Sequence, residues 1–332
     1  MAMFVESVRG MVRRLFLATF CSGLFLVLLC MLGCSRQSGQ PPLVGGDVDA
    51  QLSCKSCHVD QWKEWYASPH ATAWNSDAIQ AAFHNFGFSR KCQSCHAPEP
   101  VLVTGLKQPP VLREVSLTSG VNCLSCHGLG ESAGVAALQD NPDVACRPVK
   151  VPAIASSRLC GVCHTPIFED WAESRYAREG RTCTDCHMRN AIDGKINHRC
   201  IDLLSSAGYQ NSIEMKCFQD GEELIAEVTN RGVGHNFPGE RHNRTLSVRV
   251  IQRDGNGEVQ AAQKNLIKGI TPFRGESTQD KIKVDETVQC RFPLVIAKGV
   301  AGVTLLWKRF PWLSDDQATV VAEVEVDVWP PR

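Results

Sequence analysis

The pattern of apolar and polar residues divides the 332-residue chain into three regions. The first contains an apolar run without a charged residue, from Leu15 to Leu32. In the second, from about residue 48 to residue 206, aromatic side chains recur three positions apart, as at Trp62 and Trp65, which predicts short helices with one covered face. In the third, residues 207–332, short segments alternate apolar and polar side chains, which predicts β-strands.

The third region is predicted to be an antiparallel β-domain. Its first two segments, Ile213–Phe218 and Leu224–Val228, flank Asp220-Gly221, a residue pair typical of a tight hairpin turn. Four further segments of this kind follow, at 245–252, 281–294, 303–310 and 319–329. This series of short alternating segments favours a β-sandwich. A glycine-rich loop, residues 234–242, lies between two of the predicted strands.

The N-terminal apolar run has the features of an export signal. Three arginines precede it, and Met31-Leu32-Gly33-Cys34 closes it in the manner of a bacterial lipobox, except that leucine is usual where Met31 stands. Residues 1–33 are therefore predicted to be a lipoprotein-type signal peptide, Cys34 the lipidated first residue, and residues 34–47 a flexible tether. The alternative is an uncleaved membrane anchor. Both predict a membrane-anchored protein on the extracytoplasmic, periplasmic side.

Five copies of Cys-x-x-Cys-His dominate the second region. Each copy predicts a covalent haem c, because two thiols with this spacing bond the haem vinyl groups and the next histidine binds the iron. Zinc ribbons and thioredoxin-type pairs also contain Cys-x-x-Cys, but neither needs a histidine at the next position. The predicted thioether cysteines are Cys54, Cys57, Cys92, Cys95, Cys123, Cys126, Cys160, Cys163, Cys183 and Cys186. The predicted proximal histidines are His58, His96, His127, His164 and His187.

Five haems in about 160 residues leave too few side chains to bury each macrocycle in a conventional core. The haems must therefore pack largely against one another, wrapped by short helices and irregular loops. The predicted fold class is multidomain: a mostly helical and irregular multihaem cytochrome c domain over residues 48–206, and an all-β domain over residues 207–332.

An iron that only carries electrons usually has a second axial ligand, and the chain has five histidines outside the motifs. Of these, His70 and His198 are the best placed, and His235 lies in a loop fixed by glycine and proline that could reach the haem region. A surface role competes for the other two. The predicted distal ligands are His70, His84, His198, His235 and His242.

An internal repeat follows the first and fourth motifs. After His58 and after His164, an aromatic residue, an acid, a tryptophan, a serine and an alanine recur at equal distances. His70 in the first copy corresponds to Tyr176 in the second. The second copy has therefore lost one candidate ligand, and one iron must find a ligand elsewhere or stay open.

The cysteine count predicts two disulfides. Of 17 cysteines, two leave with the signal, one takes lipid and ten take haem, so that an even number remains in an oxidising compartment. Pairing cannot be read from the sequence, but we favour Cys217 with Cys290 and Cys146 with Cys200, with four free thiols as the alternative.

Charge argues against nucleic acid as a partner. The precursor has 35 basic and 35 acidic residues, and loss of the signal removes three arginines and Glu6, which leaves 32 and 34. A chain so nearly neutral offers no basic face for a phosphate backbone.

The first motif, followed by Trp65, Ser68 and His70-Ala71, resembles the multihaem cytochromes related to the tetrahaem electron acceptor of hydroxylamine oxidoreductase (cytochrome c-554-like). Segments 120–128 and 183–188 are also similar to the wider superfamily, which includes pentahaem nitrite reductases. The resemblance covers the haem region and implies a helical, haem-stacked fold, electron transfer and His70 as a distal ligand. This chain differs in its five motifs, its added β-domain and its lack of a Cys-x-x-Cys-Lys site.

These observations predict a membrane-tethered, extracytoplasmic pentahaem cytochrome c that carries electrons between redox partners, either other redox proteins or a quinol-linked complex. No catalytic residue is predicted. The alternative is an oxidoreductase that acts on a small nitrogen or sulfur compound at one five-coordinate haem. A third hypothesis makes the β-domain a docking module for a larger complex.

Overall fold

The computed structural model describes residues 54–85, 93–130, 134–189, 195–200, 212–239, 244–268, 281–310 and 312–330. The predicted signal peptide, lipidation site and tether lie outside these residues, as do Cys92, His242 and the predicted domain boundary at 206. All described residues belong to one compact unit, Gly45–Arg332. Within the described ranges, no helix combines the length and apolar character needed to cross a bilayer.

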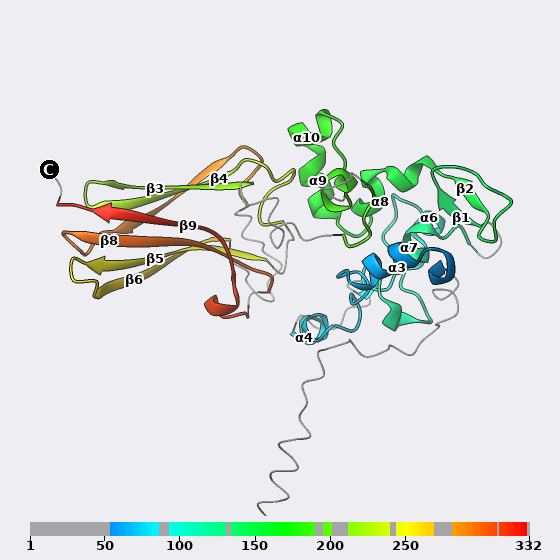
Figure 1. Ribbon diagram of the computed structural model, residues 1–332, viewed down its shortest axis with the longest axis horizontal. Helices are drawn as coiled ribbons and strands as arrows, with labels where there is room; N and C mark the ends of the chain where they lie inside the picture. The colour runs from blue at the N-terminus through cyan, green and yellow to red at the C-terminus, as the bar shows by residue number, and fades with distance from the viewer. Residues whose placement is uncertain are drawn as a thin grey trace, which may run out of the picture. The chain divides into compact units, whose positions relative to one another are not determined.

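Short helices joined by irregular loops make up the haem-motif region, as the sequence predicts (Figure 1). Two 3₁₀ turns, η1 (Leu117–Ser119) and η2 (Pro152–Ala155), and a small parallel ladder of β1 (Val135–Ala137) and β2 (Pro148–Lys150) complete it. The helices are α3 (Val59–Tyr66), α4 (Asp77–Asn85), α6 (Val101–Thr104), α7 (Cys123–His127), α8 (Ser157–Gly161), α9 (Thr165–Ala172), α10 (Arg175–Arg178) and α11 (Cys183–His187).

Two antiparallel sheets make up the C-terminal region (Figure 1). One has the order β3-β4-β7, with β3 (Ile213–Asp220), β4 (Glu223–Asn230) and β7 (Thr287–Pro293). The other has the order β6-β5-β8-β9, with β5 (Thr245–Asp254), β6 (Val259–Lys268), β8 (Gly299–Lys308) and β9 (Thr319–Val328). The 3₁₀ turn η5 (Asp315–Gln317) precedes β9. The C-terminal region is therefore all-β, as predicted.

Residues of both sheets share one hydrophobic core. Leu246, Val248 and Val250 alternate along β5 and are fully buried, because successive strand residues point to opposite sides of the sheet. Leu224 and Val228 of β4 contribute to the same cluster from the other sheet. The burial of these strands thus follows the period-two pattern of their sequence.

The predicted Asp220-Gly221 turn connects β3 to β4, and Gly221 has a φ of +58°, a conformation that glycine adopts easily. Two strand assignments differ from the prediction. The segment 281–294 contains only β7, and the sequence pattern does not predict β6, because Gln260 to Asn265 lack the β-branched residues typical of strands. Strand β6 forms the edge of its sheet, where packing demands fewer apolar residues.

The predicted disulfide between Cys217 and Cys290 is wrong. Cys217 is opposite Ala226 of β4, and Ala226 is opposite Cys290 on the other side, so a whole strand separates the two cysteines. Neighbouring strands lie about 4.7–4.9 Å apart, whereas a disulfide needs Cα atoms within about 7 Å. Cys146 and Cys200, the other predicted pair, are also free thiols.

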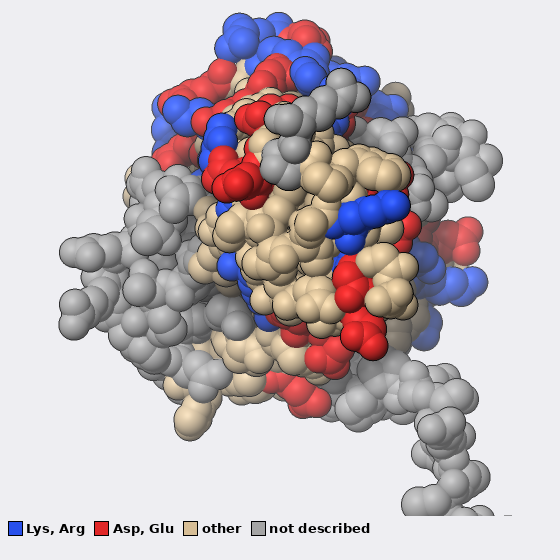
Figure 2. All heavy atoms as spheres, turned by 90° about the vertical axis from the view of Figure 1, so that its left-hand side faces the viewer, with Lys and Arg blue, Asp and Glu red and all other residues tan. Residues whose placement is uncertain are grey.

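The end of the β-domain that carries the β3–β4 turn is shown in Figure 2. Acidic and basic residues lie next to one another at the margins of this face, around a central area that has neither. Exposed apolar residues of this end include Phe218, Val295 and Trp329. The backbone carbonyl of Trp329 accepts a hydrogen bond from Gln219 at 2.8 Å, which fixes the end of β9 against β3.

Candidate functional site

Helix caps place the two thiols and the histidine of a motif on one side of a single helical turn. In the third motif, Asn122 and Ser125 exchange side-chain and backbone hydrogen bonds and begin α7 at Cys123. Residues three and four positions apart lie on the same face of a helix, so Cys126 and His127 follow Cys123 on that face. Thr182 and Asp185 cap α11 in the same way.

Backbone carbonyls orient two of the proximal histidines. The Nδ1 atom of His96 lies 2.7 Å from the carbonyl oxygen of Ala73, and that of His127 lies 2.8 Å from the carbonyl oxygen of Ala136. A hydrogen bond at Nδ1 fixes the tautomer and directs Nε2 at a metal. This is the arrangement that an iron ligand requires, and no sequence pattern indicates either carbonyl.

Three histidines from motifs face three histidines from outside the motifs. The separations between ring centres are nearly identical, and each pair joins residues remote in the sequence. The pairs are His70 with His164 at 6.3 Å, His127 with His198 at 6.4 Å, and His187 with His235 at 6.4 Å.

These separations fit one haem iron between two imidazoles. A metal–imidazole bond is about 2.0–2.1 Å long, and the ring centre lies about 1 Å behind the bonded nitrogen, so imidazoles on opposite sides of one metal have centres roughly 6 Å apart. The buried Nε of Arg113, beside Ser125 of the third motif, also has no hydrogen-bond partner among the described residues. A buried cationic donor of this kind suits the carboxylates that a haem carries.

Burial keeps two of the distal candidates neutral. Burial, followed by the charges of His164 and His96, lowers the pKa of His70 from 6.5 to about 4. Burial and then His127 lower the pKa of His198, against the opposing effect of Glu64. Metals bind the neutral imidazole, so both side chains are in the ligating form at pH 7.

The internal repeat has a structural counterpart in its first copy. The indole nitrogen of Trp65 donates to the carbonyl oxygen of Val121 at 2.8 Å, and the backbone nitrogen of Val121 donates to the carbonyl oxygen of His70 at 3.0 Å. Val121 stands two residues before Cys123. The helix that follows the first motif is thereby fixed against the start of the third.

The second copy makes the same contacts. The indole nitrogen of Trp171 donates to the carbonyl oxygen of Arg181 at 3.0 Å, and the backbone nitrogen of Arg181 donates to the carbonyl oxygen of Tyr176 at 2.9 Å. Arg181 stands two residues before Cys183. The fourth and fifth motifs are therefore related to each other as the first and third are, and each copy of the repeat is a two-motif unit.

Thiol contacts give the same grouping. A hydrogen bond with Cys54 is the largest cause that raises the pKa of the Cys123 thiol, with burial next. A hydrogen bond with Cys183 does the same for Cys160. The second motif joins through Cys95, whose hydrogen bond raises the pKa of Cys163. The first motif thus lies beside the third, and the fourth lies beside both the second and the fifth.

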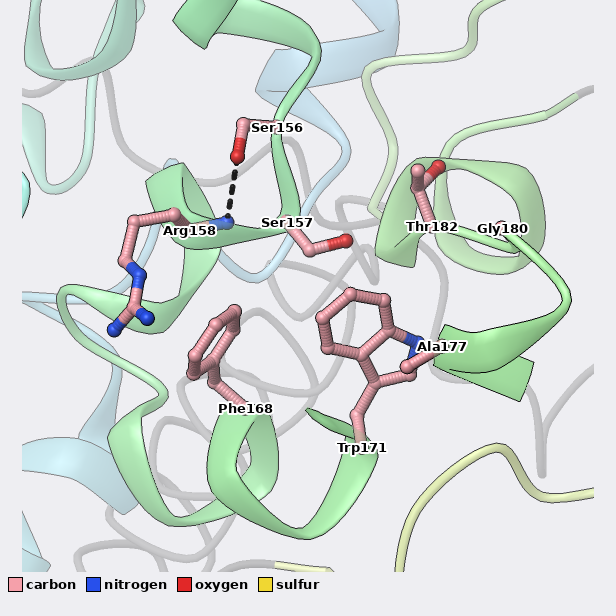
Figure 3. Close-up of a pocket in the computed structure, with 8 residues that line it drawn as sticks. All are labelled: Ser156, Ser157, Arg158, Phe168, Trp171, Ala177, Gly180 and Thr182. Carbon is pink, nitrogen blue, oxygen red and sulfur yellow. Dashed lines mark hydrogen bonds between the residues drawn. The ribbon is translucent and has the colours of Figure 1, made fainter. Parts of the chain in front are cut away.

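A cavity of about 350 Å³ lies among helices α8 to α11, between the fourth and fifth motifs (Figure 3). The Phe168 and Trp171 rings form its apolar wall, and the Arg158 guanidinium lies 4.1 Å from the centre of the Phe168 ring. The hydroxyl oxygen of Ser157 accepts a hydrogen bond from the backbone nitrogen of Cys183 at 3.0 Å. The cavity is therefore built from the segments that carry these two motifs.

The remaining predicted ligands lie outside the three facing pairs. His84 is exposed on α4, next to Phe83, whose ring centre lies 5.0 Å from that of His96. His58 is exposed, and within the described ranges no aromatic ring packs against it. His242 and Cys92 lie outside those ranges. The three pairs thus account for three of the five motif histidines, and they leave the distal ligands at His58 and His96 to be assigned.

Comparison with known proteins agrees with the chemistry of the motifs. Residues 53–128, which contain the first three motifs, match the family model for cytochrome c554 and c-prime. The solved structure of a penta-heme cytochrome c552 from Thermochromatium tepidum is similar with a TM-score of 0.60 and 17% identity, over 83% of this chain and 97% of that chain. At this identity the likeness establishes the fold.

Other similar structures cover about a third of the chain. The chicken interferon gamma receptor alpha chain matches at 15% identity over 36% of this chain and 50% of its own, with a TM-score of 0.22. A hypothetical protein from Pyrococcus horikoshii matches at 10% identity over 36% of this chain and 91% of its own, with a TM-score of 0.21. No protein with a curated description matches the sequence.

Proposed function

Since this chain is related to the multihaem cytochromes c, which supports a role in electron transfer, we propose that it is a membrane-tethered pentahaem carrier. It passes electrons between redox partners outside the cytoplasm, where c-type cytochromes typically reside. The partners are other redox proteins or a quinol-linked complex, and the tether is a lipid on Cys34. The two sheets with their shared core support a β-sandwich for the C-terminal domain.

The observation that carries this proposal is the set of three facing histidine pairs. Each pair would hold a haem iron from both sides and leave no open position for a substrate, which suits electron transfer rather than catalysis. Each haem, when bound, supplies one such electron site. The protein supplies two thiols that hold the haem, one histidine from the motif and one from a distant segment.

The contacts between motifs suggest a route for electrons. The first and third motifs form one close pair, the fourth and fifth form another, and the second lies against the fourth. The charge of Cys126 also raises the pKa of Cys160 and of Cys163, so the fourth motif has neighbours in the second, third and fifth motifs. We assign His84 and His242 as the remaining distal ligands, for the irons of His58 and His96, because they are the two histidines not used in the observed pairs.

Mass spectrometry tests the number of haems. The denatured mature protein is expected to have the mass of the chain plus five haems, because all five motifs carry both thiols and the histidine. Changing both cysteines of one motif to alanine should remove one haem mass. A wild-type protein with fewer than five covalent haems would disprove the pentahaem assignment.

The second candidate function is catalysis on a small nitrogen or sulfur compound at an open iron. It is favoured by His58, which is exposed and faces no aromatic ring among the described residues. On the carrier proposal, titration with cyanide or nitrite is expected to leave the spectra of oxidised and reduced protein unchanged. A stoichiometric spectral shift at one haem would instead identify an open site and favour the enzyme.

A further inference from the structure

An acidic residue stands directly before the tryptophan in both copies of the repeat: Glu64 before Trp65, and Asp170 before Trp171. Both lie on the short helix that follows a motif histidine, α3 in the first copy and α9 in the second. Neither acid belongs to a motif or to a facing histidine pair. Their contacts show a common role.

Glu64 holds the segment that carries His198. Its Oε2 atom accepts a hydrogen bond from the backbone nitrogen of His198 at 3.0 Å and lies 3.6 Å from the Nδ1 atom of that ring. Both side chains are 28% exposed. The His198 ring faces His127, the histidine of the third motif, which pairs with the first motif in this copy.

Asp170 holds the segment that carries His235. Its Oδ1 atom accepts a hydrogen bond from the side-chain nitrogen of Asn236 at 2.8 Å, and its Oδ2 atom lies 2.7 Å from Nζ of Lys281. The Asp170 side chain is only 17% exposed. The ring of His235, next to Asn236, faces His187 of the fifth motif, which pairs with the fourth in this copy.

We infer that this acid is, in each copy, the positioning residue for the distal histidine of the second haem of the unit. The helix of one haem thereby holds the ligand of its neighbour, so that the coordination of the two irons is coupled. The inference rests on the proposed function, because it takes His198 and His235 as iron ligands. The two ligands come from unrelated segments, one after the fifth motif and one in the β-domain, yet equivalent acids hold both.

The two acids differ in what they do to the imidazole. The carboxylate of Glu64 lies 3.6 Å from the buried Nδ1 atom of His198, which has no hydrogen-bond partner among the described residues, so the negative charge of Glu64 acts on the imidazole through space and stabilises the oxidised iron. Asp170 contacts Asn236 and Lys281, while Nδ1 of His235 lies 3.0 Å from the carbonyl oxygen of Asn236. Glu64 should therefore lower the reduction potential of its haem, whereas Asp170 should affect only how firmly the ligand is held.

The test compares two variants, Glu64→Gln and Asp170→Asn, with the wild type. Each is the full-length protein with all haems attached. Glu64→Gln is expected to raise the potential of one haem by about 59 mV, a tenfold change in its ratio of reduced to oxidised iron. Asp170→Asn is expected to leave potentials unchanged but to let cyanide, which should not alter the wild-type spectra, shift the spectrum of one haem by displacing its ligand. The conservative variant Asp170→Glu should restore the wild-type behaviour.

Exposed acids on the same helices provide matched controls. Asp60→Asn on α3 and Glu169→Gln on α9 remove the same charge from positions that face solvent. If Glu64→Gln and Asp170→Asn behave as these controls do, or only lower the melting temperature, the inference is wrong.

His198→Ala and His235→Ala separate this outcome from failure of the proposed function. Each alanine variant is compared with the acid variants. If each alanine variant yields one high-spin haem while the acid variants match their controls, the ligand assignment is supported and only the positioning role of the acids is wrong. If the alanine variants leave the spectra unchanged, the ligand assignment itself is wrong and the inference falls with it.

Discussion

Replacing Gly120 with alanine is expected to remove the sixth ligand from the haem of the fourth motif. Gly120 has a φ of +60°, and a Cβ atom there would lie within 2.4 Å of the carbonyl oxygen of His70 and 2.9 Å of that of Ala71. The backbone of His70 and Ala71 must therefore shift, and we expect the His70 ring to move away from His164 with it. One of the low-spin haems should become high spin in the absorption and electron paramagnetic resonance spectra.

The same substitution should also destabilise the protein. A non-glycine residue in a sparsely populated backbone region costs about 1–3 kcal/mol, and overpacking costs about 1–3 kcal/mol more. The second copy of the repeat offers a matched control, because Gly180 has a φ of +76° and no atom within 4 Å of the place that a Cβ atom would take. Gly180→Ala should incur the backbone cost alone and keep all haems low spin. Equal spectra for the two variants would contradict the placement of His70.

His235→Ala is expected to convert the haem of the fifth motif from low spin to high spin, because the ring that faces His187 is lost. Added imidazole should restore the low-spin spectrum by entering the space of that ring. The control is Arg231→Ala, which removes an exposed side chain from the same segment and should leave the spectra unchanged. A low-spin spectrum in His235→Ala without imidazole would rule out this ligand.

The same variant should loosen the β-domain from the haem region. Other contacts hold the two together: the Tyr176 hydroxyl donates to the carbonyl oxygen of Arg231 at 3.1 Å, and Arg175 forms an exposed ion pair with Asp285 at 3.0 Å. Asp170 also contacts Asn236 and Lys281, and this contact is the same in His235→Ala and Arg231→Ala. Exposed ion pairs contribute little, about 0–1 kcal/mol. Loss of an iron–histidine bond in His235→Ala should therefore speed limited proteolysis into a haem fragment and a β-domain fragment. The control variant, Arg231→Ala, should be cleaved at the wild-type rate.

The haem motifs can be predicted from sequence because their chemistry is local. Two thiols and a histidine within five residues define a haem site without reference to the rest of the chain. The repeat is also visible, since His70 and Tyr176 occupy equal positions after their motifs, and both make the same backbone contact in the structure. Strands with period-two alternation are predictable for the same local reason.

Features that depend on distant contacts cannot be predicted in this way. His70 and His164 are remote in the sequence, and no periodic pattern of residues predicts that their rings face each other. An even cysteine count suggests a disulfide, but the count contains no information on strand order. In the sheet, β4 lies between Cys217 and Cys290 and keeps them apart. Arg113 has the sequence context of an ordinary surface residue, yet its guanidinium is buried and donates to Ser119 and Gly120.

The position of His235 in the β-domain has a consequence for the order of assembly. If the chain is exported from its N-terminus, as we propose, the cysteines of the fifth motif would leave the membrane before the β-strands do. With His235 as the distal ligand, the iron at His187 has only one axial histidine until the β-domain has folded and docked. The last haem would then be complete only after the whole chain has been exported. A truncated chain without the β-domain would keep a reactive iron at His187.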